Sequence, residues 1–350
     1  MDFPKREIDE FGNSLILKKI ALPVELSTGN AIPIFDLLNA LLIGQHYKQR
    51  LLLPNFHNCE TVAIFSDYGG EASDSKYYTY TFTFVDSDHL HAFEDGMRTI
   101  RKQHKLDVPF KEISFKSLHY SPVTNCLDDY LRVINNVVNG LVFTLVVDKR
   151  IFSFTGSNSK KTLNELATAL NTQGFGTWKP EIAEKLSRVS QIIAYWCRLL
   201  TSDNQKLFWM TDADSIVANE EKASHCMHFI HAWIRSCKGH KQYQTVGYSV
   251  KPFEKDDQLF FTDLLSLSDL IAGSLEHYFT KKSKDTNSSI KKDADKILCW
   301  LANQGIAMKK MAIKIDLSEK NEISGSFLEF EEKEPSEHLA YFDTPYDITL

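Results

Sequence analysis

The chain contains short apolar runs bounded by turn residues, and longer stretches in which apolar positions recur every three to four residues. The first pattern is typical of strands and the second of helices. The clearest buried strand is 141–147, which is apolar except for Thr144. In 77–85, threonines alternate with aromatic residues, which predicts an antiparallel strand covered on one face only.

Strands and helices alternate along most of the chain, and this order predicts an α/β fold. The predicted strands are 60–66, 77–85, 112–118, 141–147, 206–211 and 244–250. The predicted helices are 35–48, 86–105, 122–136, 163–170, 180–200, 222–237 and 262–279.

A polar, lysine-rich stretch follows these elements. Beyond it we predict one more helix, a hairpin and an acidic tail. The linker, the helix, the two hairpin strands and the tail are 281–292, 295–305, 311–317 with 323–330, and 331–334. We therefore divide the chain into an N-terminal extension, a main domain and a C-terminal region, at 1–58, 59–280 and 281–350.

The composition is that of a folded protein. With 40 basic and 46 acidic residues the formal net charge is −6, and 43% of the residues are hydrophobic and 25% charged. These proportions exclude a low-complexity scaffold. The acidic balance argues against a surface covered with sequence-independent DNA contacts, which need basic residues. It leaves open a locally basic groove around an acidic metal site.

The chain carries no sign of a membrane or secreted protein. No apolar stretch approaches the ~20 residues that span a bilayer, and the polar start of the chain does not resemble a secretory signal. The six cysteines are scattered and form no Cys-x-x-Cys pair, which is typical of reduced thiols in a cytosolic protein. We therefore expect a cytoplasmic protein, and homo-oligomerisation stays open.

Acidic residues stand where the predicted strands end. Asp67 follows the first predicted strand, and Asp148 follows the most apolar one. Asp212 and Asp214 follow a third strand, and Asp269 lies in an otherwise apolar stretch of a late predicted helix. In open α/β sheets the ligand crevice lies beyond the carboxyl ends of the strands, so these side chains have a place to converge.

Clustered carboxylates would need a cation. Neighbouring anions raise one another's pKa unless a cation neutralises them. Mg²⁺ and Mn²⁺ prefer oxygen ligands, and paired ions can clamp both oxygens of a phosphoryl displacement. Asp is also common after strands as a turn residue or a helix cap. The residues alone therefore leave a metal site and a set of turn residues as alternatives.

Two segments, 64–70 and 267–273, resemble the two ends of the domain-of-unknown-function 3800 family. They read Ile-Phe-Ser-Asp-Tyr-Gly-Gly and Leu-Ser-Asp-Leu-Ile-Ala-Gly. Members of the family typically open with a strand ending Asp-Glu-Ser-Gly and close with Gln-x-Ala-Asp-Leu-x-Ala-Gly. The resemblance covers 60–280 and implies an RNase-H-like mixed sheet flanked by helices.

The resemblance also implies roles for individual residues. Asp67 matches the ligand on the first strand and Asp269 the ligand on the closing helix. The segment 208–214 resembles the family's late strand ending in an acidic residue, which implies Asp212 or Asp214 as a third ligand. Lys116 lies in a segment similar to the family's lysine-containing one and would contact the substrate phosphate.

The chain departs from the family pattern at both ends. Tyr68 replaces the Glu that usually follows the first Asp, although Glu71 would reach the same site around the intervening glycine turn. Ser266 and Ser268 replace the usual Gln and Ala before the last Asp. These changes leave open a site that binds nucleic acid without cutting it.

Our first hypothesis is a metal-dependent nuclease that uses Mg²⁺ or Mn²⁺ in a two-metal hydrolysis of RNA or DNA. The second is a catalytically inactive RNase-H-like binding or scaffold protein that acts through a protein or nucleic-acid partner. A role in a defence or toxin-type system is compatible with either. The residues expected to hold the ions are Asp67, Asp212 and Asp269, with Asp148, Asp214 or Glu71 completing the shell.

Two further groups of residues carry weaker signals. His225, His228 and His231 recur three apart, but a helix turns residues six apart to nearly opposite sides, so core or interface positions are favoured over zinc. Tyr77, Tyr78 and Tyr80 would stack nucleobases if one face of the sheet were open.

Overall fold

The fold is seen in a computed structural model. It describes residues 7–8, 14–15, 33–107, 111–154, 158–237, 239–250, 259–284, 291–320 and 322–329. Residues 1–6, 9–13 and 16–32 of the predicted N-terminal extension and the whole acidic tail lie outside the described residues. The helices are α1 (Pro33–Tyr47), α2 (His91–Gln103), α3 (Ser121–Val137), α4 (Lys160–Thr172), α5 (Pro180–Leu200), α6 (Glu220–Ser236), α7 (Leu259–Lys284) and α8 (Lys292–Ala302).

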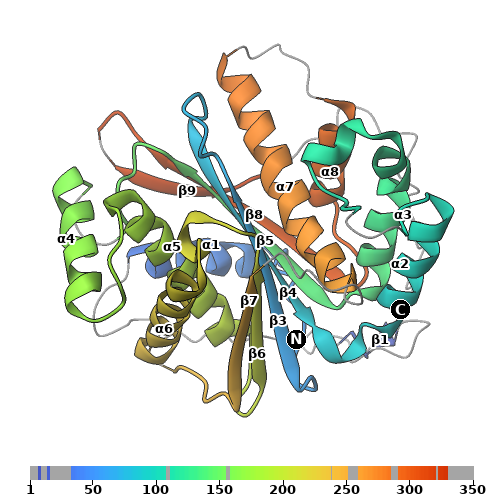
Figure 1. Ribbon diagram of the computed structural model, residues 1–350, viewed down its shortest axis with the longest axis horizontal. Helices are drawn as coiled ribbons and strands as arrows, with labels where there is room; N and C mark the ends of the chain where they lie inside the picture. Colours follow the sequence, from blue (N-terminus) through green and yellow to red (C-terminus); the bar gives the residue numbers. More distant parts are fainter. Residues whose placement is uncertain are drawn as a thin grey trace.

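The main sheet is mixed and has seven strands in the order β7-β6-β3-β4-β5-β8-β9 (Figure 1). Its strands are β3 (Thr61–Gly69), β4 (Tyr77–Asp86), β5 (Gly140–Asp148), β6 (Lys206–Thr211), β7 (Thr245–Val250), β8 (Met308–Leu317) and β9 (Ile323–Phe327). A separate pair, β1 (Glu7–Ile8) and β2 (Ser14–Leu15), is antiparallel. The prediction of an α/β fold is confirmed.

The strand directions place most carboxyl ends at one edge. Strands β3, β4 and β5 are successively antiparallel, β6 and β7 run parallel to β3, and β8 runs parallel to β5. Only β4 and β9 point the other way. The ends of β3, β5, β6, β7 and β8 therefore share the edge at which the sequence places its acidic residues.

Helices cover both faces of the sheet (Figure 1). One apolar core lies between the sheet and helices α1, α4, α5 and α6, and the other lies between the sheet and helices α2, α3, α7 and α8. We call these the α5 face and the α7 face. Alternate residues of a strand point to opposite faces, so neighbouring residues of β3 lie in different environments.

Strand β4 is covered on both faces, and the prediction of a half-covered strand is wrong. The aromatic residues from Tyr78 onward pack on the α5 face, whereas Tyr77 and the threonines lie on the face covered by α7. The hydroxyl of Thr83 lies 2.9 Å from the hydroxyl of Ser268. Because helix hydroxyls and carbonyls satisfy the threonine side chains, polar residues can occupy a buried face.

The predicted strand at 112–118 is also wrong. This segment ends in a 3₁₀ helix, η2 (Lys116–His119), which leads into α3. The hydroxyl of Ser117 accepts from the backbone N–H of Ser114 at 2.9 Å and donates to the carbonyl of Glu112 at 3.1 Å. Such local side-chain bonds compete with strand pairing and favour a turn.

The C-terminal hairpin is present as β8 and β9, and it extends the main sheet beyond β5. Helix α7 continues into the predicted linker as far as Lys284, and residues 285–290 lie outside the described part. None of the six cysteines forms a disulfide. No helix in the described part of the chain is both long enough and apolar enough to cross a bilayer.

A buried ion pair attaches α2 to the start of α7. Arg101 is 3% exposed and Asp263 is 1% exposed, and the arginine Nε donates to Asp263 Oδ2 at 2.9 Å. The Arg101 Nη1 also donates to the carbonyls of Leu106 and Lys111, each at 2.8 Å. The hydroxyl of Tyr130 donates to the backbone carbonyl of Asp263 at 2.6 Å. These bonds set the position of α7 over the sheet.

We expect Arg101→Met to destabilise the fold by about 3–5 kcal/mol, because it leaves the Asp263 carboxylate buried without a partner. Arg98→Met, on the same helix, removes only exposed pairs with Glu94 and Asp95 and should cost less than about 1 kcal/mol. Urea unfolding measures both changes. The double variant Arg101→Met with Asp263→Leu should recover most of the loss; no recovery would contradict the assignment.

Candidate functional site

Helix α7 brings Asp269 to the end of strand β3. The hydroxyl of Ser268 donates to the carbonyl of Phe65 at 3.1 Å. One turn further along, the hydroxyl of Thr79 donates to the carbonyl of Ala272 at 3.2 Å. These two contacts lie on either side of Asp269, so its carboxyl group faces the sheet where β3 ends.

Asp67 lies inside β3 on the α7 face and meets Asp269 there. Burial raises the pKa of Asp67 well above its usual range, and the negative charges of Asp269 and Asp212 raise it further. A side-chain hydrogen bond with Asp269 acts in the same direction. Two carboxyl groups share a hydrogen bond only when one of them carries a proton. Without a cation, the pair therefore holds a proton beyond the pH at which an isolated Asp loses it.

Asp212 follows directly after β6 and lies beside the same pair. In the parallel register Ser66 is paired with Thr211, so the next residues of the two strands, Asp67 and Asp212, emerge next to each other. Asp212 is half-buried, and its Oδ1 accepts from the backbone N–H of Ala213 at 2.7 Å. Three of the acidic residues that the sequence singles out therefore gather at one place.

A backbone contact orients the Asp269 carboxyl group. Its Oδ2 accepts from the backbone N–H of Phe115 at 2.6 Å. The ring of Phe115 occupies the space beside Gly273, where an added Cβ would lie 2.4 Å from the ring. Lys116 comes next in the chain and is exposed. Its side chain therefore starts one residue away from the contact with Asp269.

Glu276 also belongs to this region, and the sequence analysis did not find it. It lies seven residues after Asp269 on α7, a spacing that places both on one side of a helix. A Cβ added at Gly69 would lie 2.9 Å from the Glu276 Oε2 and 2.6 Å from the Thr79 Oγ1. Glycine at position 69 thus allows the carboxylate to approach the strand. The seven-residue spacing between Asp269 and Glu276 is the feature of the sequence from which this position could have been predicted.

Asp214 and Glu71 lie on the α5 face and share a different partner. Both form ion pairs with Lys185 of α5, and the Asp214 Oδ2 is 2.6 Å from the Lys185 Nζ. Burial lowers the pKa of Lys185, but the charges of Asp214 and Glu71 outweigh burial and raise it overall. A single internal ammonium therefore already pairs with both carboxylates. They are not brought to Asp67.

Tyr68, the residue after Asp67, points away from the carboxyl pair. It follows Asp67 on a strand, and it therefore faces α5. Its hydroxyl lies 2.8 Å from the hydroxyl of Ser66, and the Lys185 Nζ is 4.9 Å from the centre of its ring. The residue at this position contributes to the α5 face and not to the candidate metal site.

Asp148 is 5% exposed and is bound by Arg150. The Arg150 Nε donates to its Oδ2 at 3.0 Å, and the Arg150 backbone N–H donates to its Oδ1 at 2.9 Å. Burial raises the pKa of Asp148, but the bonds from Arg150 outweigh burial and lower it overall. Because Arg150 also donates to the carbonyl of Leu317 at 2.5 Å, this group connects β5 to β8, two strands away from Asp67.

The carboxyl pair by itself is not a complete ligand set. Within the described ranges, no three His, Cys, Asp or Glu side chains stand together in a way that could hold one metal ion. Mg²⁺ is often bound through only one or two carboxylates, with water and substrate phosphates completing the shell. The oxygen chemistry of Asp67 and Asp269 fits that mode of binding.

The histidine repeat lies on α6, away from these carboxylates. His228 and His231 are exposed, which rules out a core position for them. His225 is half-buried, and its Nδ1 lies 4.0 Å from the Glu221 carboxylate.

Comparison with known proteins finds no family model that matches the chain and no significant match among curated proteins. The likeness to the domain-of-unknown-function 3800 family therefore rests on the two short motifs around Asp67 and Asp269.

We expect Asp67→Asn to stabilise the protein by about 1–3 kcal/mol at neutral pH without divalent ions, because the amide removes a buried charge beside Asp269. The pKa of Asp67 is higher in the folded chain than in the unfolded chain. The wild type therefore loses stability as the pH rises from the unfolded value toward the folded one. The extra stability of Asp67→Asn over wild type should vanish in acid and grow as the pH rises. Urea unfolding of both proteins from about pH 3 to pH 8 measures it.

Asp148→Asn is the matched control and should behave in the opposite way. The pKa of Asp148 is lowered in the folded chain by Arg150. The stability it supplies is present above the unfolded pKa and disappears as the pH falls through the folded one. The variant should therefore have a lower free energy of unfolding than wild type at neutral pH and the same free energy of unfolding in acid. A loss at neutral pH in Asp67→Asn as well would show that the Asp67–Asp269 contact is not repulsive.

Proposed function

We propose that the chain is a metal-dependent nuclease built on an RNase-H-like sheet. The middle of the sheet supports this topology. Strands β3, β4 and β5 form an antiparallel meander, and β6 and β7 extend the sheet in parallel on the other side of β3. The likeness of the two motifs to the domain-of-unknown-function 3800 family points the same way.

The observation that carries the proposal is the contact between Asp67 and Asp269, with Asp212 beside it. The two carboxyl groups come from a strand and a helix that are 202 residues apart in the chain, so no local turn or cap requires them to meet. Burial of such a pair is unfavourable unless a proton or a cation neutralises it. A hard divalent cation is the partner that suits three carboxylates at a strand end.

In this proposal Asp67 and Asp269 hold Mg²⁺ or Mn²⁺, and Asp212 completes the acidic side of the site. The ions would activate water and stabilise the leaving oxygen of a phosphodiester. The Phe115 backbone N–H keeps the Asp269 carboxylate turned toward the strand end. Lys116, exposed beside it, would contact a substrate phosphate. RNA and DNA both suit this chemistry, and a protein partner in a defence or toxin-type system is compatible with it.

Cleavage of labelled RNA and DNA strands in the presence of Mn²⁺ or Mg²⁺ tests the proposal. We expect Asp67→Asn and Asp269→Asn each to reduce the rate by about 100-fold or more, because each removes a charged ligand from the reaction centre. Asp95→Asn, an exposed acidic residue on α2, should leave the rate unchanged. Equal rates in wild type and Asp67→Asn would remove the assignment.

A second candidate is a binding or scaffold protein with an inactive site. Within the described residues no three potential ligands stand together, and the position of the family's second acidic residue holds Tyr68, which faces away. A proton shared by Asp67 and Asp269 would then be the permanent state of the pair.

Calorimetric titration with Mn²⁺ separates the two candidates. The nuclease proposal expects heat of binding in the wild type that disappears in Asp269→Ala. Absence of binding in both proteins, at millimolar Mn²⁺, would favour the inactive protein. If Asp269→Ala still binds Mn²⁺, the metal site lies in another part of the chain.

A further inference from the structure

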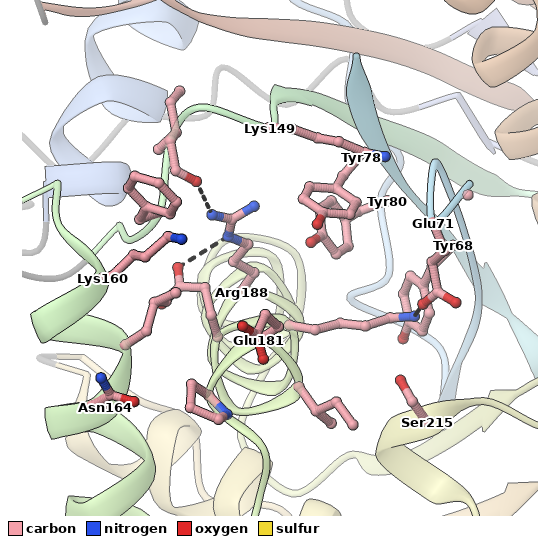
Figure 2. Close-up of a pocket in the computed structure, with 18 residues that line it drawn as sticks. Tyr68, Glu71, Tyr78, Tyr80, Lys149, Lys160, Asn164, Glu181, Arg188 and Ser215 are labelled. Carbon is pink, nitrogen blue, oxygen red and sulfur yellow. Dashed lines mark hydrogen bonds and ion pairs between the residues drawn. The ribbon is translucent and has the colours of Figure 1, made fainter. Parts of the chain in front are cut away.

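A cavity lies on the α5 face (Figure 2). The carboxyl pair lies on the other face of strand β3. The volume of the cavity is about 540 Å³, within the range of pockets that hold small ligands. The end of β3 and the start of β4 line one side, and the first turns of α4 and α5 line the other. Gly69 and Glu71 line the cavity, and Asp67 lies two residues before Gly69 on the same strand. The cavity and the carboxyl pair therefore lie at the same edge of the sheet.

Most of the acidic groups in this cavity already have cationic or hydrogen-bonding partners. Glu184 is 4% exposed. One of its oxygens accepts from the Arg188 Nε at 3.0 Å and from the backbone N–H of Phe154 at 3.0 Å, and the other accepts from the Ser153 hydroxyl at 3.0 Å. Glu71 is paired with Lys185. Among the acidic residues that line the cavity, this leaves the exposed Glu181.

Two of the cationic groups of the cavity, Arg188 and Lys160, differ in how they are bound. Figure 2 shows the ammonium of Lys160 and the guanidinium of Arg188 on the same side of the cavity, directed toward each other. Arg188 is 2% exposed, and its Nη2 donates to the carbonyl of Ile151 at 2.6 Å, so the fold holds it in place. Lys160 is exposed at the start of α4. The Glu184 carboxylate already pairs with Arg188, so the positive charge that this side of the cavity offers to an anionic ligand is that of Lys160.

An aromatic surface lies opposite these cations. The rings of Tyr78 and Tyr80 project from β4 into the cavity (Figure 2). Tyr78 is half-buried. The Lys149 Nζ lies 5.0 Å from the centre of its ring and the Arg188 guanidinium carbon 5.8 Å. An aromatic ring held at a cavity wall offers a surface on which a planar base can stack.

We propose that this cavity binds a nucleotide, with the base against Tyr78 and the phosphate beside the exposed ammonium of Lys160. The ligand combines an aromatic base with a phosphate, and either a free mononucleotide or one unit of a strand supplies it. Because the cavity and the carboxyl pair share the end of β3, a bound strand can pass from one to the other. That last step rests on the proposed nuclease function, whereas nucleotide binding does not.

Titration of the full chain with AMP in EDTA, followed by calorimetry, tests the proposal. We expect AMP to bind and adenosine or inorganic phosphate alone to bind at least about 10-fold more weakly, because each makes only part of the contacts. Lys160→Ala should weaken AMP binding about 10-fold. Lys161→Ala, the neighbouring residue on α4, is exposed and paired with Glu165 and should change nothing.

Tyr78→Leu tests the aromatic wall in the same way. We expect it to weaken AMP binding by about 10-fold through loss of stacking, while phosphate binding stays unchanged. Tyr77→Leu is the matched control, since Tyr77 faces the other side of β4 and its hydroxyl donates to Asp316 at 3.1 Å.

Several results would overturn the proposal. The first is an absence of binding by both AMP and a 5′-phosphorylated single strand, and the second is equal weakening in Lys160→Ala and Lys161→Ala. A strand that binds at least about 10-fold more tightly than AMP identifies a strand as the source, and the reverse order identifies a free nucleotide. AMP binding without any cleavage would uphold this site and reject the nuclease. Cleavage of a strand by a protein that binds no nucleotide would uphold the nuclease and reject this site.

Discussion

The meeting of the Asp67 and Asp269 carboxyl groups is the contact that the rest of the candidate site depends on, and the surrounding structure has to enforce it. A buried pair of like groups opposes folding. The Arg101–Asp263 ion pair fixes the first part of α7, and the Ser268 and Thr79 hydroxyl bonds attach the helix to the sheet on either side of Asp269. Because these favourable bonds fix α7 on the sheet, they can keep the unfavourable contact between Asp67 and Asp269 in place.

Strand β3 divides the polar groups of this edge into two sets. Asp67 faces α7 and meets other acidic residues, whereas Tyr68 faces α5 and lies beside Lys185. On the α7 face the negative charges of Asp269 and Asp212 raise the pKa of Asp67. On the α5 face Glu71 and Asp214 both form ion pairs with Lys185. Similar acidic residues at one sheet edge therefore differ in chemistry because a strand alternates its side chains.

Much of the fold could be predicted where burial alone decides it. The strand at 206–211 and the helix at 180–200 match β6 and α5 at both ends, because their apolar spacing is regular. The prediction failed where side chains found specific partners. The 112–118 segment became a turn through Ser117, and the threonines of β4 were buried because hydroxyls on α7 satisfy them.

The sequence by itself determined the α/β class, the order of the elements and the presence of acidic residues at strand ends, since periodicity and composition are local properties. It did not decide which acidic residues meet. Asp148 and Asp214 stand after strands just as Asp212 does, yet Arg150 and Lys185 bind them. Only the tertiary structure decided this, because a carboxylate's partner depends on the sheet face it reaches and on which helix crosses there.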